Sequence, residues 1–143
     1  MMDLEECIRK GLVIRDKRDL DAARKSLEVA EHKLHLAERA FEAKLFEDAI
    51  INCYACIFHA GRALMFKDGF RERSHFGLFV FLKERYSDKL EPRFLSELNA
   101  LRLERHDLLY SLEISEVKGV EAEHVIGVAK DFLNAIKKLV NYP

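Results

Sequence analysis

The sequence predicts an all-α protein, an up-and-down bundle of four to five helices. Apolar residues recur at steps of three and four along most of the chain, which is the spacing of one face of an α-helix. The 143 residues include only two prolines and six glycines, so helices can continue for many turns. No segment shows the strict apolar–polar alternation of a half-buried strand. Short connections between long helices favour antiparallel neighbours.

Length and composition predict one globular domain over residues 1–143, in which 1–19 form a short helix and a lead-in. Hydrophobic residues make up 49% of the chain and charged residues 34%, which is ordinary for a helical globule and too apolar for disorder. The formal net charge is −1, so no global positive field attracts nucleic acid. A nucleotide or RNA would therefore need a local cluster of binding residues.

The N-terminal half is predicted to hold a short amphipathic helix over 4–14 and two long helices. The first long helix covers 20–43, where Asp19 or Asp21 is suited to cap the N-terminus. Its apolar stripe consists of Leu20, Ala23, Leu27, Ala30, Leu34, Ala37 and Phe41. The second covers 46–67, and Gly69 stands where a helix is expected to stop.

The C-terminal half is predicted to hold three further helical segments. After a charged loop over 70–74, Ser74 is placed to cap a helix over 75–85. Pro92 suits the first turn of the next helix, which is expected to end near Ile114. A linker containing Gly119 leads to the last helix, over 121–140. Its apolar stripe is Val125, Val128 or Ala129, Phe132, Ile136 and Leu139.

The most hydrophobic stretch, 49–66, is predicted to be a helix buried in the bundle and not a membrane span. Asn52, His59 and Arg62 interrupt it, and a bilayer core tolerates such groups poorly. With no membrane segment and no signal peptide, the three cysteines, an odd number, favour a reducing cytoplasm. Cys53 and Cys56 have the spacing of half a zinc or redox site, but their apolar helix favours core packing.

Arg105 interrupts the apolar stripe of the helix that begins at Pro92. The stripe consists of Phe94, Leu98, Leu101, Leu108 and Leu112. An unpaired charge is costly in such a position. Two interpretations stay open: a buried ion pair with an acid of another helix, and an anchor for a phosphate or carboxylate, which the planar guanidinium serves well.

A second stripe on the same helix carries Arg102, His106, Tyr110 and Glu113. Residues four apart share a helix face, so His106 can touch both Arg102 and Tyr110. The stripe is either a solvated face, as charged stripes usually are, or a set of groups for acid–base chemistry and binding.

Three further features lie before the helix that begins at Pro92, each at or beside a histidine. His59 and Arg62 are the ionisable residues of an apolar run, and they are either hydrogen-bonded structural residues or ligand-binding residues. Small Ala60 and Gly61 beside them indicate a close helix approach, within the bundle or across a dimer axis. His75 is interpreted as a surface residue at a helix start.

Several catalytic motifs are absent from the sequence. It contains no H-E-x-x-H or other metal-binding histidine spacing, no glycine-rich phosphate loop and no G-x-S-x-G. We therefore predict no metal and no cofactor, and a self-sufficient nucleotidyltransferase is disfavoured.

Residues 45–50 and 52–66 contain a tyrosine followed by F-H-A and R-A-L segments, and they resemble the signature helix of the HEPN family. Further segments that resemble this family follow in order, and the resemblance covers residues 20–140. Ser74 and His75 match a serine- or threonine-histidine step before the third helix, and the segment from Arg105 to Tyr110 resembles an R-x4-Y element. The C-terminal A-K-D-F-L-N-A-I-K stretch is also typical of the family.

This resemblance implies a HEPN bundle, of the kind found in substrate-binding subunits of nucleotidyltransferases, which is commonly dimeric. It also implies that the protein acts together with a small nucleotidyltransferase, as a toxin–antitoxin or regulatory pair. Many HEPN proteins are metal-independent ribonucleases with an R-x4–6-H motif, whose Arg and His meet at the dimer groove. Here Tyr110 occupies the position of that histidine counted from Arg105, and His106 follows Arg102 too closely.

The missing histidine directs the functional prediction towards binding. A tyrosine, with a pKa near 10, is a poor general base at neutral pH. We predict a homodimer that binds nucleotide, RNA or a partner nucleotidyltransferase, with Arg105 as the anion anchor. The other predicted binding residues are Arg102, His106, Tyr110, His59 and Arg62. The alternatives are a metal-independent ribonuclease toxin, with Arg105, His106 and Tyr110 as catalytic candidates, and a pure protein-interaction module.

Overall fold

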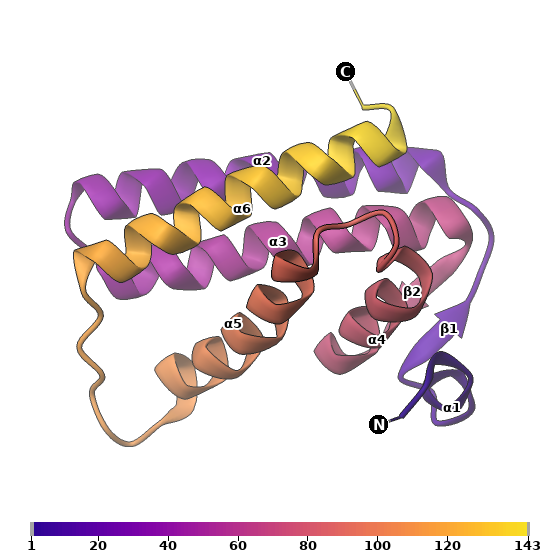
Figure 1. Ribbon diagram of the computed structural model, residues 1–143, viewed down its shortest axis with the longest axis horizontal. Coiled ribbons are helices and arrows are strands. Elements are labelled where there is room, and N and C mark those ends of the chain that lie inside the picture. The colour runs from indigo at the N-terminus through magenta and orange to yellow at the C-terminus, as the bar shows by residue number, and fades with distance from the viewer. Residues whose placement is uncertain (1, 143) are drawn as a thin grey trace.

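A computed structural model describes residues 2–142 and contains six helices and two short strands in that range (Figure 1). In chain order the elements are α1 (Leu4–Arg9), β1 (Val13–Arg15), α2 (Leu20–Glu42), α3 (Phe46–Asp68), β2 (Phe70–Glu72), α4 (His75–Tyr86), α5 (Pro92–Tyr110) and α6 (Gly119–Val140). The predicted all-α class is confirmed, and the two long N-terminal helices begin and end within one residue of the predicted limits.

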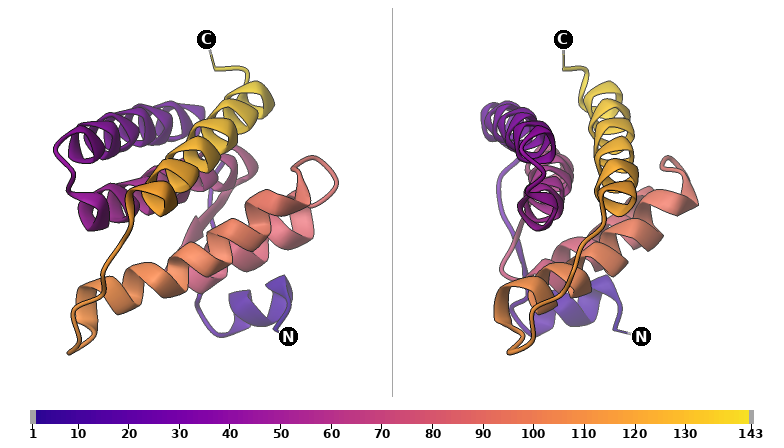
Figure 2. Two further views of the ribbon diagram at one scale, coloured as in Figure 1. Left: turned by 60° about the vertical axis from the view of Figure 1, so that its left-hand side comes forward. Right: turned by 90° about the vertical axis from the view of Figure 1, so that its left-hand side faces the viewer.

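The helices form two groups that share α3 as their common core. Helices α2, α3 and α6 lie side by side along the long axis, and α2 and α3 form an antiparallel hairpin (Figure 1). Helices α4 and α5 pack against α3 and cross this group at an angle (Figure 2). The molecule is thus a bundle of three long helices with a tilted helical pair across it.

Side-chain caps fix the helix starts that position the later site. The Asp19 side chain accepts a hydrogen bond from the Ala22 amide at the start of α2. Ser74 does the same for the Gly77 amide at the start of α4, at 2.8 Å. Gly69 ends α3 in the left-handed conformation, with φ of 85°, a region that glycine enters without steric cost. The predicted caps at Ser74 and Gly69 are confirmed, and Asp19 is the cap of α2.

Helix α3 contributes more buried residues than any other helix of the described chain. Within residues 2–142 it is the one helix long and apolar enough to cross a membrane by length and composition, and 61% of that apolar window is buried. Helices α2, α4, α5 and α6 all pack against it, so its apolar side chains contact other helices inside the bundle. A cytoplasmic location stays a prediction.

The close approach at Ala60 and Gly61 is between α3 and α4 of one chain. A β-carbon built on Gly61 would lie 3.1 Å from Leu82 Cδ1 and 3.3 Å from both terminal methyl groups of Leu78. The two helices therefore pack closely where α3 has no side chain. Of the two interpretations, the structure supports contact within the bundle.

Cys53 and Cys56 are core residues. Both are fully buried as free thiols, and burial raises the pKa of each to about 12. They stay protonated near neutral pH, which suits packing and not metal ligation. In the part of the chain that the structure describes, no three His, Cys, Asp or Glu side chains gather as a metal site requires.

The prediction that the chain lacks strands was wrong around residues 10–15 and 70–72. Helix α1 ends at Arg9 and not at Ile14, and Gly11 turns the chain with φ of 73°. Strand β1 then pairs antiparallel with β2, which lies in the predicted charged loop, with Val13 opposite Glu72. Strands of three residues are too short to show a reliable alternation.

The helix that begins at Pro92 is shorter than predicted. It ends at Tyr110 and not near Ile114, and Ser111 is extended. Leu108 is partly buried against the core and Leu112 is fully exposed, so the predicted apolar stripe ends at Leu108 and does not include Leu112. The physical reason is that the segment after α5 runs away from the bundle to reach the start of α6 (Figure 1), which leaves Leu112 no core to face.

Candidate functional site

A hollow of roughly 670 Å³ lies between the start of α4 and the second half of α5. Its lining residues are Ser74, His75, Phe76, Arg102, Leu103, Arg105, His106 and Asp107. The cap at Ser74 makes His75 the first residue of α4. On α5, steps of three and four along the helix bring Arg102, Arg105 and His106 to the same opening. Two arginines and two imidazoles thus meet at one hollow.

Neither arginine of the hollow has a carboxylate partner in residues 2–142. The Arg105 guanidinium lies over the Tyr54 ring, 5.5 Å from its centre, and the Arg102 guanidinium lies 5.6 Å from the centre of Phe76. Arg102 Nη2 donates to Asn99 Oδ1 at 3.0 Å, while its Nε is buried without a hydrogen-bond partner. The first interpretation of Arg105, a buried ion pair, is therefore wrong for the described chain.

His75 lies against α3 and is not the surface residue that the sequence predicts. Its Nδ1 is 2.8 Å from the Tyr54 hydroxyl, and its ring centre is 4.4 Å from that of Phe58. Burial lowers the pKa of His75, and the positive charges of Arg105 and Arg102 lower it further. The imidazole is therefore neutral near pH 7. Sequence patterns do not reveal this contact, because Tyr54 lies on another helix 21 residues away.

His106 and Tyr110 are neighbours, as their spacing predicts, and both are exposed. Their ring centres are 5.0 Å apart. His106 lines the hollow, whereas Tyr110, at 64% exposed, does not. The predicted contact between Arg102 and His106 is not present among the interactions of the described residues. Glu113 lies beyond the end of α5, so the predicted polar stripe stops at Tyr110.

His59 and Arg62 lie outside the hollow and join α3 to β2. Arg62 Nη1 is 3.2 Å from His59 Nδ1. Arg62 Nε is 2.9 Å from Glu72 Oε1, an ion-pair contact without the angle of a hydrogen bond. The guanidinium also lies near the rings of Phe58 and Phe66. This arrangement supports the structural interpretation of the pair over the ligand-binding one.

We expect acid to destabilise the fold through His59. Burial lowers the pKa of His59 to about 4, with further lowering from the positive charges of Arg62 and Lys33. The unfolded chain binds this proton near pH 6.5, so the free energy of unfolding falls as the pH drops from about 6.5 to about 4. We expect a loss of about 2 kcal/mol, less than the full shift implies because the ring is partly solvated.

Urea denaturation of the wild type and of His59→Asn at pH 7 and pH 4.5 measures this effect. The variant keeps a polar side chain without a titrating ring, so its stability should fall less between the two pH values. An equal fall in both proteins would show that His59 does not carry the acid sensitivity.

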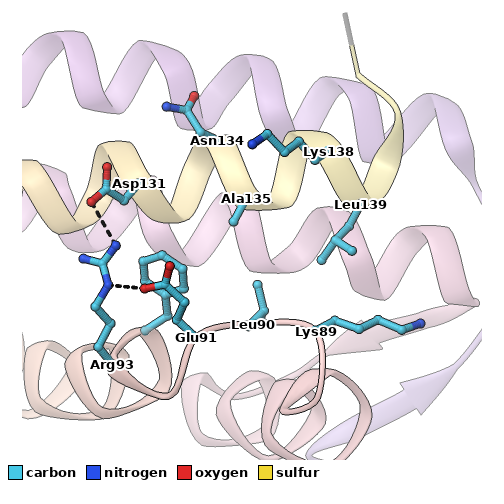
Figure 3. A pocket seen from close by; sticks show the side chains of 10 residues that line it. Lys89, Leu90, Glu91, Arg93, Asp131, Asn134, Ala135, Lys138 and Leu139 are labelled. Carbon is cyan, nitrogen blue, oxygen red and sulfur yellow. Dashed lines mark hydrogen bonds and ion pairs between the residues drawn. The ribbon is translucent and has the colours of Figure 1, made fainter.

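A second hollow, of roughly 560 Å³, lies between the α4–α5 connection and the C-terminal half of α6 (Figure 3). Its arginine, Arg93, bonds to Glu91 and to Asp131, the latter at 2.9 Å. Figure 3 shows the guanidinium between these two carboxylates. Because the charge of Arg93 is compensated within the chain, this arginine is less suited to bind an anion than Arg102 and Arg105.

The fold and the hollow define a class: a small α-helical bundle with uncompensated arginines at one opening. A model of the HEPN domain family matches residues 17–139. The chain belongs to the HEPN family. Strand β1 and helix α1 precede the matched residues.

Two relatives come from the archaeon Methanocaldococcus jannaschii. The protein named "Putative toxin MJ0605" is 32% identical over 118 residues, which cover 78% of this chain and 84% of the relative. The protein named "Putative toxin MJ0142" is 28% identical over 131 residues, which cover 90% of this chain and 86% of the relative. The chain is therefore a HEPN protein with relatives named as toxins.

Proposed function

We propose that this HEPN protein binds the phosphate groups of a nucleotide or of RNA in the hollow between α4 and α5. The observation that carries the proposal is that Arg102 and Arg105 line this hollow with no carboxylate partner in the described residues. A planar guanidinium matches phosphate oxygens with paired donors. The free positive charge of both groups is therefore available to a bound anion.

The surroundings of the two arginines favour an anion further. The start of α4 lines the hollow, and its first turn contains no acidic residue, so the positive end of the helix dipole is not offset there. Phe76 adds an aromatic ring on which a base can stack. The net charge of the whole chain is −1, so attraction of a polyanion has to come from this local cluster.

We also propose that the protein acts as a single-domain homodimer and as the toxin of a two-protein system. The names of the relatives support the toxin role. Leu112 and Ile114 are fully exposed after the end of α5, and burial of such residues favours association with a second copy. The partner of the pair is a small nucleotidyltransferase, as the family resemblance implies.

Fluorescence anisotropy with a labelled oligouridylate, and with a labelled adenosine monophosphate, tests the binding proposal. The wild type should bind at least one of them, and the double variant Arg102→Ala/Arg105→Ala should bind more than tenfold less tightly. Lys17→Ala/Lys118→Ala is the matched control, because it removes the same charge from exposed sites outside the hollow. Light scattering on the same samples gives the oligomeric state.

Two outcomes would contradict parts of this proposal. An equal loss of affinity in both double variants would show that binding depends on the net charge of the protein and not on the hollow. No binding of either ligand by a folded wild type would leave a pure protein-interaction module as the function.

A second candidate function is a metal-independent ribonuclease. The observation that favours it is that two imidazoles, those of His75 and His106, line the same hollow as Arg105, and an imidazole is the commonest general acid–base group. This function predicts that the oligonucleotide in the binding samples is cut in the presence of a chelator, and that Arg105→Ala or His106→Ala stops the cutting. Intact RNA after prolonged incubation with the wild type would count against it.

A further inference from the structure

We propose that His75 is a further ligand-binding residue of the hollow, which contacts the bound phosphate through Nε2 and takes up a proton from solvent as the phosphate binds. This inference rests on the proposed function and adds a proton-linked group that is not among the predicted binding residues. Three observations carry it: the fixed orientation of the imidazole, the free ring nitrogen, and the charges that face the ring.

Tyr54 and Phe58 fix the imidazole on the wall of α3. The Tyr54 hydroxyl is 2.8 Å from His75 Nδ1, and the tyrosine is only 1% exposed. Burial raises the pKa of Tyr54 to about 12, so the hydroxyl keeps its proton. Within residues 2–142 its one hydrogen-bond partner is His75 Nδ1. A buried hydroxyl left without an acceptor is destabilising, so Tyr54 donates to Nδ1.

This hydrogen bond determines which tautomer His75 adopts. With Nδ1 accepting, the ring hydrogen of the neutral imidazole sits on Nε2. In the described chain Nε2 has no partner, and His75 is one of the residues that line the hollow. Nε2 therefore offers a donor to a ligand, next to the guanidinium groups of Arg102 and Arg105.

The charges around His75 explain why its imidazole is neutral in the free protein and protonated when a phosphate is bound. From α5, Arg105 and Arg102 lower the pKa of His75, in addition to burial, and His106 and Asp107 line the same hollow. From α3, the facing group is the protonated Tyr54, and Glu72 of β2 is paired with Arg62. A phosphate between the arginines adds a negative charge that offsets their repulsion of a proton on His75.

Proton uptake needs no other reactant. The proton comes from solvent and binds the ring nitrogen that had accepted from Tyr54, so both ring nitrogens then donate. Nε2 donates to a phosphate oxygen as a charge-assisted hydrogen bond, and Nδ1 donates to the Tyr54 oxygen, which accepts instead of donating. The Tyr54 hydroxyl hydrogen then loses its acceptor, and the charge-assisted bond to the phosphate offsets this cost. Because the bound state holds more protons than the free state, affinity must rise as the pH falls.

Isothermal titration calorimetry with a short oligouridylate tests this linkage. Neither the phosphodiesters nor uracil titrate between pH 6 and pH 8, so any proton taken up binds the protein. Titrations at pH 7 in two buffers of different ionisation enthalpy should show uptake of a fraction of one proton by the wild type. The affinity should fall severalfold from pH 6 to pH 8. His75→Asn should bind more weakly, with no uptake and no such pH dependence.

The control variant is His124→Asn, since His124 is an exposed histidine paired with Glu97 on another part of the surface. It should keep the proton uptake of the wild type. If His75→Asn does not fold, an NMR titration of the wild-type His75 ring replaces it, and the pKa of His75 should rise when oligouridylate is added.

The possible failures separate the two proposals. Binding with no proton uptake, or uptake that persists in His75→Asn, would overturn the role of His75 and leave the binding function intact. Uptake lost in His106→Asn but kept in His75→Asn would assign the proton to the other imidazole and overturn the proposal. No binding by the wild type would overturn the proposed function and this inference together.

Discussion

Arg105→Ala should weaken the binding of single-stranded RNA by roughly ten- to a hundredfold. A hydrogen bond from a charged group contributes about 1.5–3 kcal/mol, and each 1.4 kcal/mol corresponds to a factor of ten in affinity. The full charge of Arg105 is available to a bound phosphate, because its guanidinium lies over the Tyr54 ring and has no carboxylate partner in the described residues. Fluorescence anisotropy with an oligouridylate measures the change.

Two further variants make this prediction specific. Arg93→Ala changes an arginine on the same helix whose charge is already held by Glu91 and Asp131, so it should alter RNA affinity less than twofold. Arg105→Lys keeps the charge but loses the planar pair of donors and should retain part of the affinity. If Arg105→Ala folds with the wild-type melting temperature and binds RNA equally well, Arg105 is not the anion anchor.

Gly77→Ala should lower the free energy of unfolding by about 2–4 kcal/mol. A β-carbon on Gly77 would lie 2.5 Å from the Leu12 carbonyl oxygen and 2.9 Å from Val13 Cγ2. The nearest atom belongs to the backbone beside the β1–β2 ribbon, so it cannot rotate away, and overpacking of this kind costs about 1–3 kcal/mol or more. Chemical denaturation monitored by circular dichroism measures the loss.

Gly127→Ala is the matched control, since it makes the same substitution in another helix. A β-carbon on Gly127 meets no atom within 4 Å, so alanine should stabilise α6 by about 0.5–1 kcal/mol through its higher helix propensity. The two substitutions should therefore have opposite signs. A neutral or stabilising Gly77→Ala would mean that the segment containing Leu12 moves aside without cost, and that it does not hold the start of α4.

The helices were predictable wherever a long apolar stripe and a local cap coincide. In α2, the cap at Asp19 and the buried residues Ala23, Leu27 and Ala30 all follow from spacing within the helix. The ends of α1 and α5 were not predictable in this way. Ile14 was predicted to end the short first helix, yet it lies in a strand. Leu112 continues the apolar stripe of α5 in the sequence, yet it is fully exposed, because a stripe is buried only where another element covers it.

The site was predictable only in the part that lies on one helix. Arg105 was selected because an arginine in an apolar stripe is costly without a partner, and Arg102 and His106 were selected as part of the polar stripe beside it. All three line the hollow. Tyr110 was selected on the same helix, but it points to solvent beside His106. His59 and Arg62 were selected as the polar groups of an apolar run, and the structure pairs them with each other and Arg62 with Glu72.

The sequence by itself determined the helical class, the caps and the HEPN family, because these depend on spacing within one segment and on motifs in order. Only the tertiary structure decided which of the charged groups are compensated and which are not. Arg62 and Arg93 have carboxylate partners from elsewhere in the chain, whereas Arg102 and Arg105 have none among the described residues. His75 became part of the site through Tyr54 for the same physical reason: hydrogen bonds and desolvation depend on distances between helices, which a linear pattern does not contain.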